Sequence, residues 1–303
     1  MTISGQPQYL DVVHRLHPGA RLLAARPLAG GVSAQVTALE VTHPDGRVET
    51  LVLRRHGAAD LARDPEVAAH EFQVLQALQA AGVPAPAPLH LDASGTLLPT
   101  PWLLQSFVDG DAADVPVELD DHMRQLAEAL AAIHRVPASA VPFLPLQEDQ
   151  GATLIAQPRP EPDETLAESR LRAALAATWP PPRRNPPVLL HGDVWPGNLL
   201  WRHGRLRAVI DWEDAAVGDP LADLANARLE LSIALGEDAM AILTRHYLAL
   251  SEIDTTALPL WELWAALRPI ADLPGWGLEP EAERRLRQRH RAFTGRALAA
   301  VGG

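Results

Sequence analysis

The feature that most constrains this chain is a polar turn between two apolar runs, in the segment VLLHGDVWPGNLLW (188–201). Each apolar run is short enough to be a buried strand. Pro196 and Gly197 are sufficient to make the turn, so the side chains of His191, Asp193 and Asn198 require another explanation. They are therefore candidates for chemistry rather than for chain reversal.

A second acid follows after one hairpin. The sequence LLWRHGRLRAVIDWEDA (199–215) predicts two short strands, and Asp211 comes directly after the second one. We expect Asp193, Asn198 and Asp211 to converge, because they lie at the ends of adjacent strands. Phosphoryl transfer needs a base on the acceptor hydroxyl and hard oxygen ligands for Mg²⁺. This trio supplies both.

Composition excludes several other classes. The chain has 303 residues, 47% of them hydrophobic, which is sufficient for a globular protein of two lobes. The formal net charge of −12 argues against nucleic acid and against an anionic membrane surface as partners. No apolar run approaches the ~20 residues of a membrane span, and the N-terminus lacks a signal-peptide pattern, so we expect a cytoplasmic protein. The absence of cysteine excludes disulfides, thiolate nucleophiles and cysteine-ligated zinc.

The order of elements predicts two lobes. Residues 21–56 alternate in polarity and are broken by glycine-containing turns, which predicts a β-meander, and 101–110 predicts one more strand. Between them, DPEVAAHEFQVLQALQAAG (64–82) predicts a helix capped by Asp64, with Pro65 at its first position. Helical patterns dominate from Gly110 onward. We therefore expect a domain of residues 1–109 and a second of 110–303.

One carboxylate lies on the apolar face of that helix. Glu71 is four residues after Val67 and four before Leu75, so it shares their stripe and needs a partner if it is buried. Arg54 on the strand LVLRR (51–55) is the predicted partner. The alternative is that Glu71 lies at the stripe edge and reaches solvent.

The segments HGDVWPGN (191–198) and IDWEDAAVGDPLADLA (210–225) together resemble the aminoglycoside phosphotransferase family, which also includes choline, homoserine and methylthioribose kinases. The resemblance extends from the GGVS loop to about residue 230. It implies an α+β, bilobed protein-kinase-like fold, with an N-terminal antiparallel sheet carrying one helix and a mainly helical C-terminal lobe.

The resemblance also implies roles for the polar turn. Asp193 is similar to the catalytic base that orients the acceptor hydroxyl, and Asn198 and Asp211 resemble the two magnesium ligands. His191 is like the histidine that braces the catalytic loop through hydrogen bonds.

Two further acids, Asp219 and Asp223, match the carboxylates that tie the following helix to the catalytic loop. As residues at the start of a helix, they have an equally good explanation in helix capping.

For the nucleotide, the resemblance assigns a covering loop and a hinge. Gly31 and Ser33, in LAGGVSAQV (28–36), resemble the loop that covers the phosphates, and backbone groups from Gln105 to Phe107 resemble the hinge that binds the purine edge.

The phosphate-binding residue departs from the family. All 26 basic residues are arginines, and Arg54 occupies the place of the usual lysine. Arg54 shares a strand face with Val52, so it is better placed than Arg55 to point inward. Glu71 matches the helix glutamate that pairs with this basic residue. Arginine can bind phosphate through its fork, although its geometry differs from that of lysine.

The expected function is transfer of the γ-phosphoryl group of ATP or GTP to a hydroxyl group, with Mg²⁺ held by Asn198 and Asp211. A cationic or amphiphilic acceptor is expected at the helical lobe, beside acidic and aromatic residues. These are Trp195, Trp212, Glu213 and the segment around Trp276.

Two alternatives stay open. A pseudokinase that binds nucleotide without turnover is favoured by the missing lysine, whereas the presence of the base and both metal ligands favours an enzyme. A metal-dependent hydrolase would use His191, Asp193, His203 and Asp211. Against it, His203 lies in a predicted solvent-facing turn, and His134 is expected to be a packed helix histidine rather than a ligand.

Overall fold

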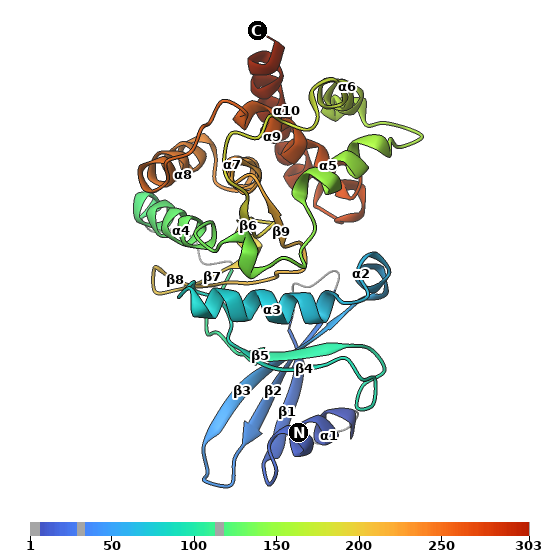
Figure 1. Ribbon diagram of the computed structural model, residues 1–303, viewed down its shortest axis with the longest axis vertical. Coiled ribbons are helices and arrows are strands. Elements are labelled where there is room, and N and C mark those ends of the chain that lie inside the picture. Colours follow the sequence, from blue (N-terminus) through green and yellow to red (C-terminus); the bar gives the residue numbers. More distant parts are fainter. Residues whose placement is uncertain (1–6, 29–33, 113–117, 303) are drawn as a thin grey trace. The chain divides into compact units, whose positions relative to one another are not determined.

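The computed structural model describes residues 7–28, 34–112 and 118–302. The chain forms two compact units (Figure 1). The N-terminal unit comprises Met1–Gly110 and Arg207–Glu213, and the helical unit comprises Asp111–Leu206 and Asp214–Gly303. The segment Arg207–Glu213 was expected in the helical lobe, but its contacts place it in the N-terminal unit. None of the described helices is long and apolar enough to cross a membrane.

The N-terminal unit contains a five-stranded antiparallel sheet with the order β1-β2-β3-β5-β4. Its strands are β1 (Arg21–Pro27), β2 (Ala34–Thr42), β3 (Val48–His56), β4 (Pro88–Asp92) and β5 (Trp102–Ser106). The predicted meander is confirmed by β1, β2 and β3, which follow one another in sequence and in the sheet.

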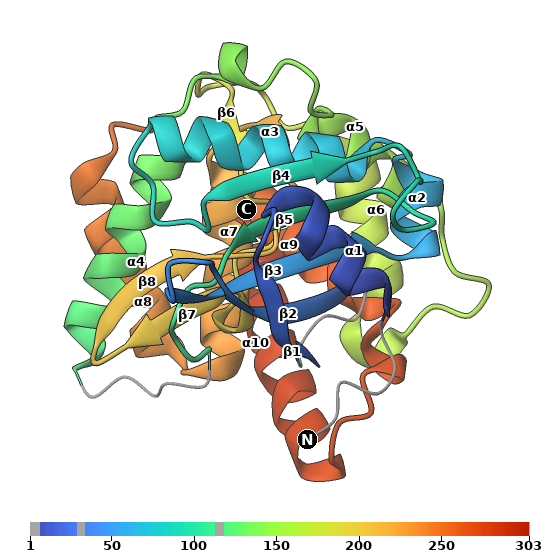
Figure 2. The ribbon, with the colours of Figure 1, turned by 90° about the horizontal axis from the view of Figure 1, so that it is seen from below.

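The sheet carries a helix on each face, which Figures 1 and 2 show from two sides. Helix α1 (Pro7–Leu16) packs on one face, where its Val12 and Val13 join a core with Leu51 and Leu53 of β3. Helix α3 (Val67–Ala80) packs on β3, β4 and β5. Because strand side chains alternate, Arg54 points to the α3 face.

The described residues of this unit form α2 (Ala58–Arg63) in addition to α1 and α3, where one helix was expected. Helix α3 begins at Val67, two residues later than expected. Asp64 instead forms a turn before the helix, because its carboxylate accepts the Glu66 N–H (2.9 Å) and its carbonyl accepts the Val67 N–H (3.2 Å).

The helical unit is built around α7 (Leu221–Ala234), which packs against α8, α9 and α10 (Figure 1). Its other helices are α4 (Leu119–Ile133), α5 (Gln147–Ala156), α6 (Glu168–Thr178), α8 (Glu237–Leu250), α9 (Leu258–Leu267) and α10 (Pro280–Gly302). Strands β6 (Val188–Leu190) and β9 (Ala216–Gly218) pair antiparallel, and β7 (Leu199–Arg202) pairs with β8 (Arg205–Val209). The loop 191–198 lies between β6 and β7, as the sequence predicted.

Candidate active site

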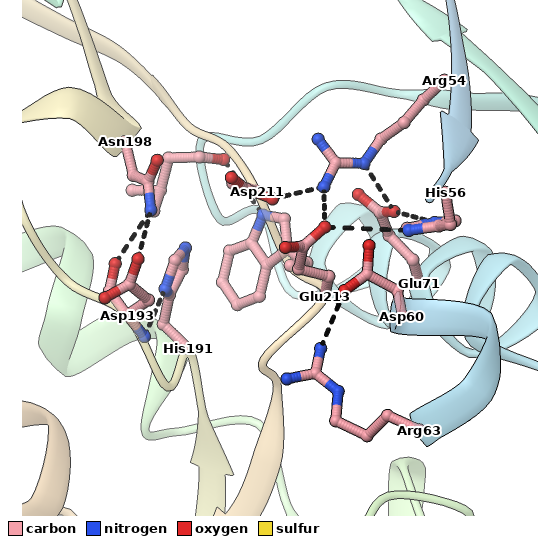
Figure 3. A network of polar contacts seen from close by, with 12 residues as sticks. Arg54, His56, Asp60, Arg63, Glu71, His191, Asp193, Asn198, Asp211 and Glu213 are labelled. Carbon is pink, nitrogen blue, oxygen red and sulfur yellow. Dashed lines mark hydrogen bonds and ion pairs between the residues drawn. The ribbon is translucent and has the colours of Figure 1, made fainter. Parts of the chain in front are cut away.

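A buried arginine organises the polar site of the N-terminal unit (Figure 3). The Nε atom of Arg54, on β3, lies 3.0 Å from Oε2 of Glu71 on α3, so the predicted ion pair is present. The Nη2 atom of Arg54 donates to the Asp211 carboxylate and to Oε2 of Glu213 (2.5 Å). Arg54 and Glu71 are 5% and 2% exposed. We call Arg54, His56, Glu71, Asp211 and Glu213 the Arg54 cluster.

His56 is a member that sequence reasoning missed. Its Nε2 atom lies 2.9 Å from Oε2 of Glu71, and its Nδ1 atom lies 3.7 Å from Oε2 of Glu213. Burial favours the neutral ring, but the contacts with Glu213 and Glu71 raise the pKa of His56 to about 9. The sequence could have predicted this position, because His56 is two residues after Arg54 on the same strand and therefore shares its face.

Charge pairing decides the protonation states in this cluster. Burial favours neutral Glu71, but the Arg54 guanidinium lowers the pKa of Glu71 below its ordinary value. Burial of Asp60, on α2, raises its pKa, and the negative charge of Glu213 adds to the effect. The cluster thus concentrates carboxylates around one guanidinium and one imidazole.

The backbone after β8 brings two acids to Arg54. Asp211 has a left-handed φ of 71°, a conformation that is costly for a residue with a side chain and typical of functional sites. Trp212, between the two acids, is buried and donates its indole N–H to the carbonyl of Val209 (3.0 Å). The expectation that Trp212 and Glu213 line an acceptor pocket is therefore wrong: the indole is 2% exposed, and the carboxylate of Glu213 binds Arg54.

In the helical unit, backbone hydrogen bonds hold the loop 191–198 to α7. The carboxylate of Asp223 accepts the N–H groups of His191 (2.7 Å) and Gly192 (2.9 Å). His134 approaches the same carboxylate through Nε2 (3.2 Å), while its Nδ1 lies 2.6 Å from the Tyr247 hydroxyl. Burial would raise the pKa of Asp223, but His134 lowers it. Asp223 thus ties α7 to the loop, and His134 is packed in the helical unit as expected.

Arg268 holds the other side of the loop and was also missed. Its Nη1 atom donates to the carbonyl of Gly192 (2.6 Å) and to the side-chain oxygen of Asn226 (2.9 Å), and Asn226 in turn donates to the carbonyl of Val194 (3.2 Å). Gly192 has a φ of 84°, and a Cβ atom there would lie 2.0 Å from the carbonyl oxygen of Asp214. Only glycine fits this position.

Asp193 and Asn198 face each other within the loop (Figure 3). The amide of Asn198 donates to the carbonyl (3.0 Å) and to the carboxylate (3.2 Å) of Asp193. The Asp193 N–H donates to Nδ1 of His191 (3.1 Å), which is the bracing contact expected of this histidine. Burial raises the pKa of Asp193, although Arg268 and His191 lower it in part. The result is a positioned, largely desolvated carboxyl group.

Glu230 is a second acid beside Asp193. It lies on α7 one turn after Asn226, and residues four apart share a helix face. Burial, followed by the negative charge of Asp193, raises the pKa of Glu230 to about 7, while Arg268 opposes the rise. No sequence signal distinguished Glu230 from the other acids of the helical unit.

The residues predicted for the phosphate-covering loop and the hinge lie partly outside the described structure. Gly31 and Ser33 lie outside the described residues. Gln105, on β5, pairs with Val52 and Pro88, and Phe107 directly follows that strand.

Asp219 accepts from the side chain of Asn185 and from the N–H of Leu221, each at 3.0 Å. The second bond matches its alternative interpretation as a helix-start residue. The predicted magnesium ligands Asn198 and Asp211 belong to the helical and N-terminal units, respectively.

The comparison with known families is specific. The model of the phosphotransferase enzyme family matches residues 24–270, which is most of the chain. Mouse (Mus musculus) acyl-CoA dehydrogenase family member 10 is 30% identical over 194 residues, which are 58% of this chain and 18% of that protein. The chain therefore spans less than a fifth of the length of that relative.

Solved structures share the fold. The GDP complex of wild-type aminoglycoside 2'-phosphotransferase-IIIa has a TM-score of 0.66 at 19% identity, covering 99% of this chain and 98% of that one. Macrolide 2'-phosphotransferase MphH of Brachybacterium faecium has a TM-score of 0.63 at 20% identity, covering 93% and 97%.

A thermostable mutant of aminoglycoside phosphotransferase APH(4)-Ia, in a ternary complex with AMP-PNP and hygromycin B, has a TM-score of 0.66 at 18% identity, covering 96% and 98%. These similarities establish a protein-kinase-like fold, with an N-terminal five-stranded antiparallel sheet and a helical C-terminal lobe.

Proposed function

Because the chain belongs to the phosphotransferase enzyme family, we propose that it is a small-molecule kinase that transfers the γ-phosphoryl group of ATP or GTP to a hydroxyl group. The observation that carries this proposal is the loop 191–198. There the amide of Asn198 donates to both the backbone carbonyl and the carboxylate of Asp193, so a desolvated carboxyl group is held in position, as a general base requires.

In this mechanism Asp193 orients the acceptor hydroxyl and accepts its proton. The loop must hold the carboxylate within about 3 Å of that hydroxyl, since misplacement by 1 Å costs catalysis heavily. Asp223 and Arg268 act as positioning residues, because they bind the loop backbone on both sides of Asp193.

The nucleotide is assigned to Arg54 and to the residues that resemble magnesium ligands. The carboxylate of Asp211 and the amide oxygen of Asn198 are hard donors of the kind that Mg²⁺ prefers. Bound Mg²⁺ would neutralise charge on the phosphates. Arg54 keeps its Nε on Glu71 and offers its Nη2 to phosphate, in exchange for the carboxylates that it now binds.

For the acceptor we propose a cationic or amphiphilic alcohol. Glu230 supports this choice, because its carboxyl group lies beside Asp193 and would gain a counter-charge from an amine on the acceptor. The relatives described as acting on aminoglycosides and macrolides are consistent with such an acceptor.

A second candidate is a nucleotide-binding module without turnover. The observation that favours it is Arg54, which replaces lysine and is held by three carboxylates. The hydrolase is not proposed, because the Nδ1 atom of His191 accepts a backbone N–H and His203 lies in an exposed turn.

Two measurements test the proposal in order. Thermal unfolding with ATP or GTP, with and without Mg²⁺, should show a metal-dependent rise in Tm that Asp211→Ala abolishes, since a ligand of the native state stabilises it. Arg54→Lys should keep this shift and Arg54→Gln should lose it.

Phosphate transfer to a panel of amino alcohols should then occur with the wild type. Asp193→Asn should retain the nucleotide-dependent shift and lose transfer. A shift without transfer to any acceptor would favour the binding module, and no shift at millimolar nucleotide would contradict both candidates.

A further inference from the structure

A cluster of metal-ligating side chains lies at the turns of the N-terminal unit, apart from the Arg54 cluster. His17, His43 and Glu49 each offer a ligand atom, and these atoms all lie within 4.8 Å of one another. All three side chains are half-buried, so solvent reaches them. None of them belongs to the residues assigned to nucleotide, base or acceptor.

Ordered backbone holds each of the three residues. His17 directly follows α1, and its N–H donates to the carbonyl of Val13 (2.8 Å). His43 opens the turn between β2 and β3, where its N–H donates to the carbonyl of Arg47 (2.8 Å), and Glu49 lies on β3.

The two turns also touch. A Cβ atom on Gly19, in the turn after α1, would lie 3.1 Å from Cγ of Pro44, in the turn between β2 and β3. The three side chains are thus brought together by two packed turns rather than by one flexible segment.

From this arrangement we propose that His17, His43 and Glu49 form a binding site for a divalent transition-metal ion such as Zn²⁺ or Ni²⁺. Two imidazoles and one carboxylate are the donor set that these ions favour, whereas Mg²⁺ favours oxygen ligands alone. With three protein ligands, water completes the coordination.

Present contacts show how the ion is accommodated. The imidazole rings lie edge to face, with centroids 5.2 Å apart, and Nε2 of His43 is 2.7 Å from Oε1 of Glu49. In the metal-bound form the His43 ring carries its proton on Nδ1, and Nε2 and Oε1 both face the cation. A neutral imidazole has one nitrogen lone pair, so each ring offers one ligand atom to the cation.

Arg47 orients the carboxylate and also limits the affinity. Its Nη1 donates to Oε2 of Glu49, the oxygen that does not contact His43. The guanidinium is 55% exposed and can turn into solvent when a cation binds. In a second described group of possible ligands, His56, Asp60 and Glu213, the guanidinium bound to Glu213 is that of buried Arg54, so that group is a poorer cation site.

The test is isothermal titration of the full, untagged chain after treatment with EDTA. Zn²⁺ and Ni²⁺ should each saturate one site, and Mg²⁺ at the same concentration should not occupy it. His17→Ala and His43→Ala should weaken binding on the order of 100-fold, Glu49→Gln about 10-fold, and Arg47→Gln should strengthen it several-fold. Unfolding in EDTA checks that each variant is folded.

His70→Ala is the matched control, because His70 forms another imidazole–carboxylate pair, 2.6 Å from Asp64, and belongs to neither described group of three possible ligands. It should bind metal as the wild type does, and so should Asp211→Ala. The proposal is overturned if His17→Ala and His43→Ala keep wild-type affinity, if His70→Ala loses as much as they do, or if no saturable site exists.

Discussion

The Arg54 cluster and the loop 191–198 are both polar and partly buried, yet different kinds of contact hold them. In the Arg54 cluster, charged side chains bind other charged side chains, with Arg54 between Glu71, Asp211 and Glu213. In the loop, side chains bind backbone groups, so the loop is fixed without using the carboxylate of Asp193 as an ion-pair partner.

This difference suggests a division of labour. A guanidinium can exchange one anionic partner for another, which is the property that the proposed function requires of Arg54 when phosphate binds. Hydrogen bonds to backbone groups hold a geometry, and a base needs a fixed geometry more than it needs exchange. Substitutions in the two regions should therefore have different consequences.

The largest effect is expected for Asp193→Asn. Loss of the proposed base should lower the turnover rate about 10²–10⁴-fold, while the Tm changes little, because an amide oxygen at position 193 can still accept the hydrogen bond from Asn198. Phosphate release in a coupled assay and thermal unfolding measure the two quantities. An Asp193→Asn variant with the wild-type turnover rate would contradict the proposed role of Asp193 as the base.

Asp223→Ala should break the loop itself. It leaves two buried backbone N–H groups and His134 without their acceptor, so we expect a loss of about 3–5 kcal/mol in the free energy of unfolding. Urea denaturation measures this. Asp219→Ala is the control and should cost less, because it removes the acceptor of one backbone N–H, at the start of α7, and of the Asn185 amide.

Glu71→Gln should cost less than Asp223→Ala, because Arg54 keeps its contacts with Asp211 and Glu213. We expect a loss of about 2 kcal/mol together with a lower pKa of His56, which an NMR titration of the ring detects. Glu66→Gln, at an exposed acid just before α3, is the control. Equal destabilisation by both changes would show that the buried pairs contribute nothing.

The smallest effect concerns Glu230 and depends on pH. Its pKa of about 7 in the native state exceeds the ordinary 4.5, so the native state holds this proton more tightly than the unfolded state does. The free energy of unfolding should therefore fall as the pH rises from about 4.5 to 7.

Glu230→Gln should remove that part of the fall and leave the variant more stable than the wild type at pH 8, with no difference near pH 4. Parallel urea titrations at both pH values measure the difference. The same difference at both pH values would contradict the proposed burial of the charge.

Sequence patterns predicted the local parts of this site well. The stripe on 67–78 and the two-residue period of β3 indicated Arg54 as the partner of Glu71 but left open that Glu71 reaches solvent, and the family resemblance favoured the pair that the structure contains. The polar turn was sufficient to locate Asp193 and Asn198. Each of these inferences uses neighbours within one element or across two adjacent elements.

Two kinds of site residue were not predicted: residues distant in sequence from their partners, and a residue indicated by the two-residue strand period, which was not applied to it. Arg268 lies 76 residues from Gly192, and no pattern indicates which of many arginines reaches that carbonyl. His56 is the case of the unused periodicity, since it is two residues after Arg54 on the same strand. Trp212 was wrongly placed at the acceptor because no sequence pattern distinguishes a buried tryptophan from one that lines a pocket.

The segment Arg207–Glu213 has a consequence for how the protein is made. The first 110 residues are synthesised long before Asp211 and Glu213. Until then, Arg54 and His56 of the nascent N-terminal unit have Glu71 as the cluster carboxylate with which they can pair. The N-terminal unit is complete only when Glu213, 103 residues after Gly110, has been translated. A fragment ending at Gly110 therefore lacks part of the N-terminal unit, including two of the carboxylates that bind Arg54.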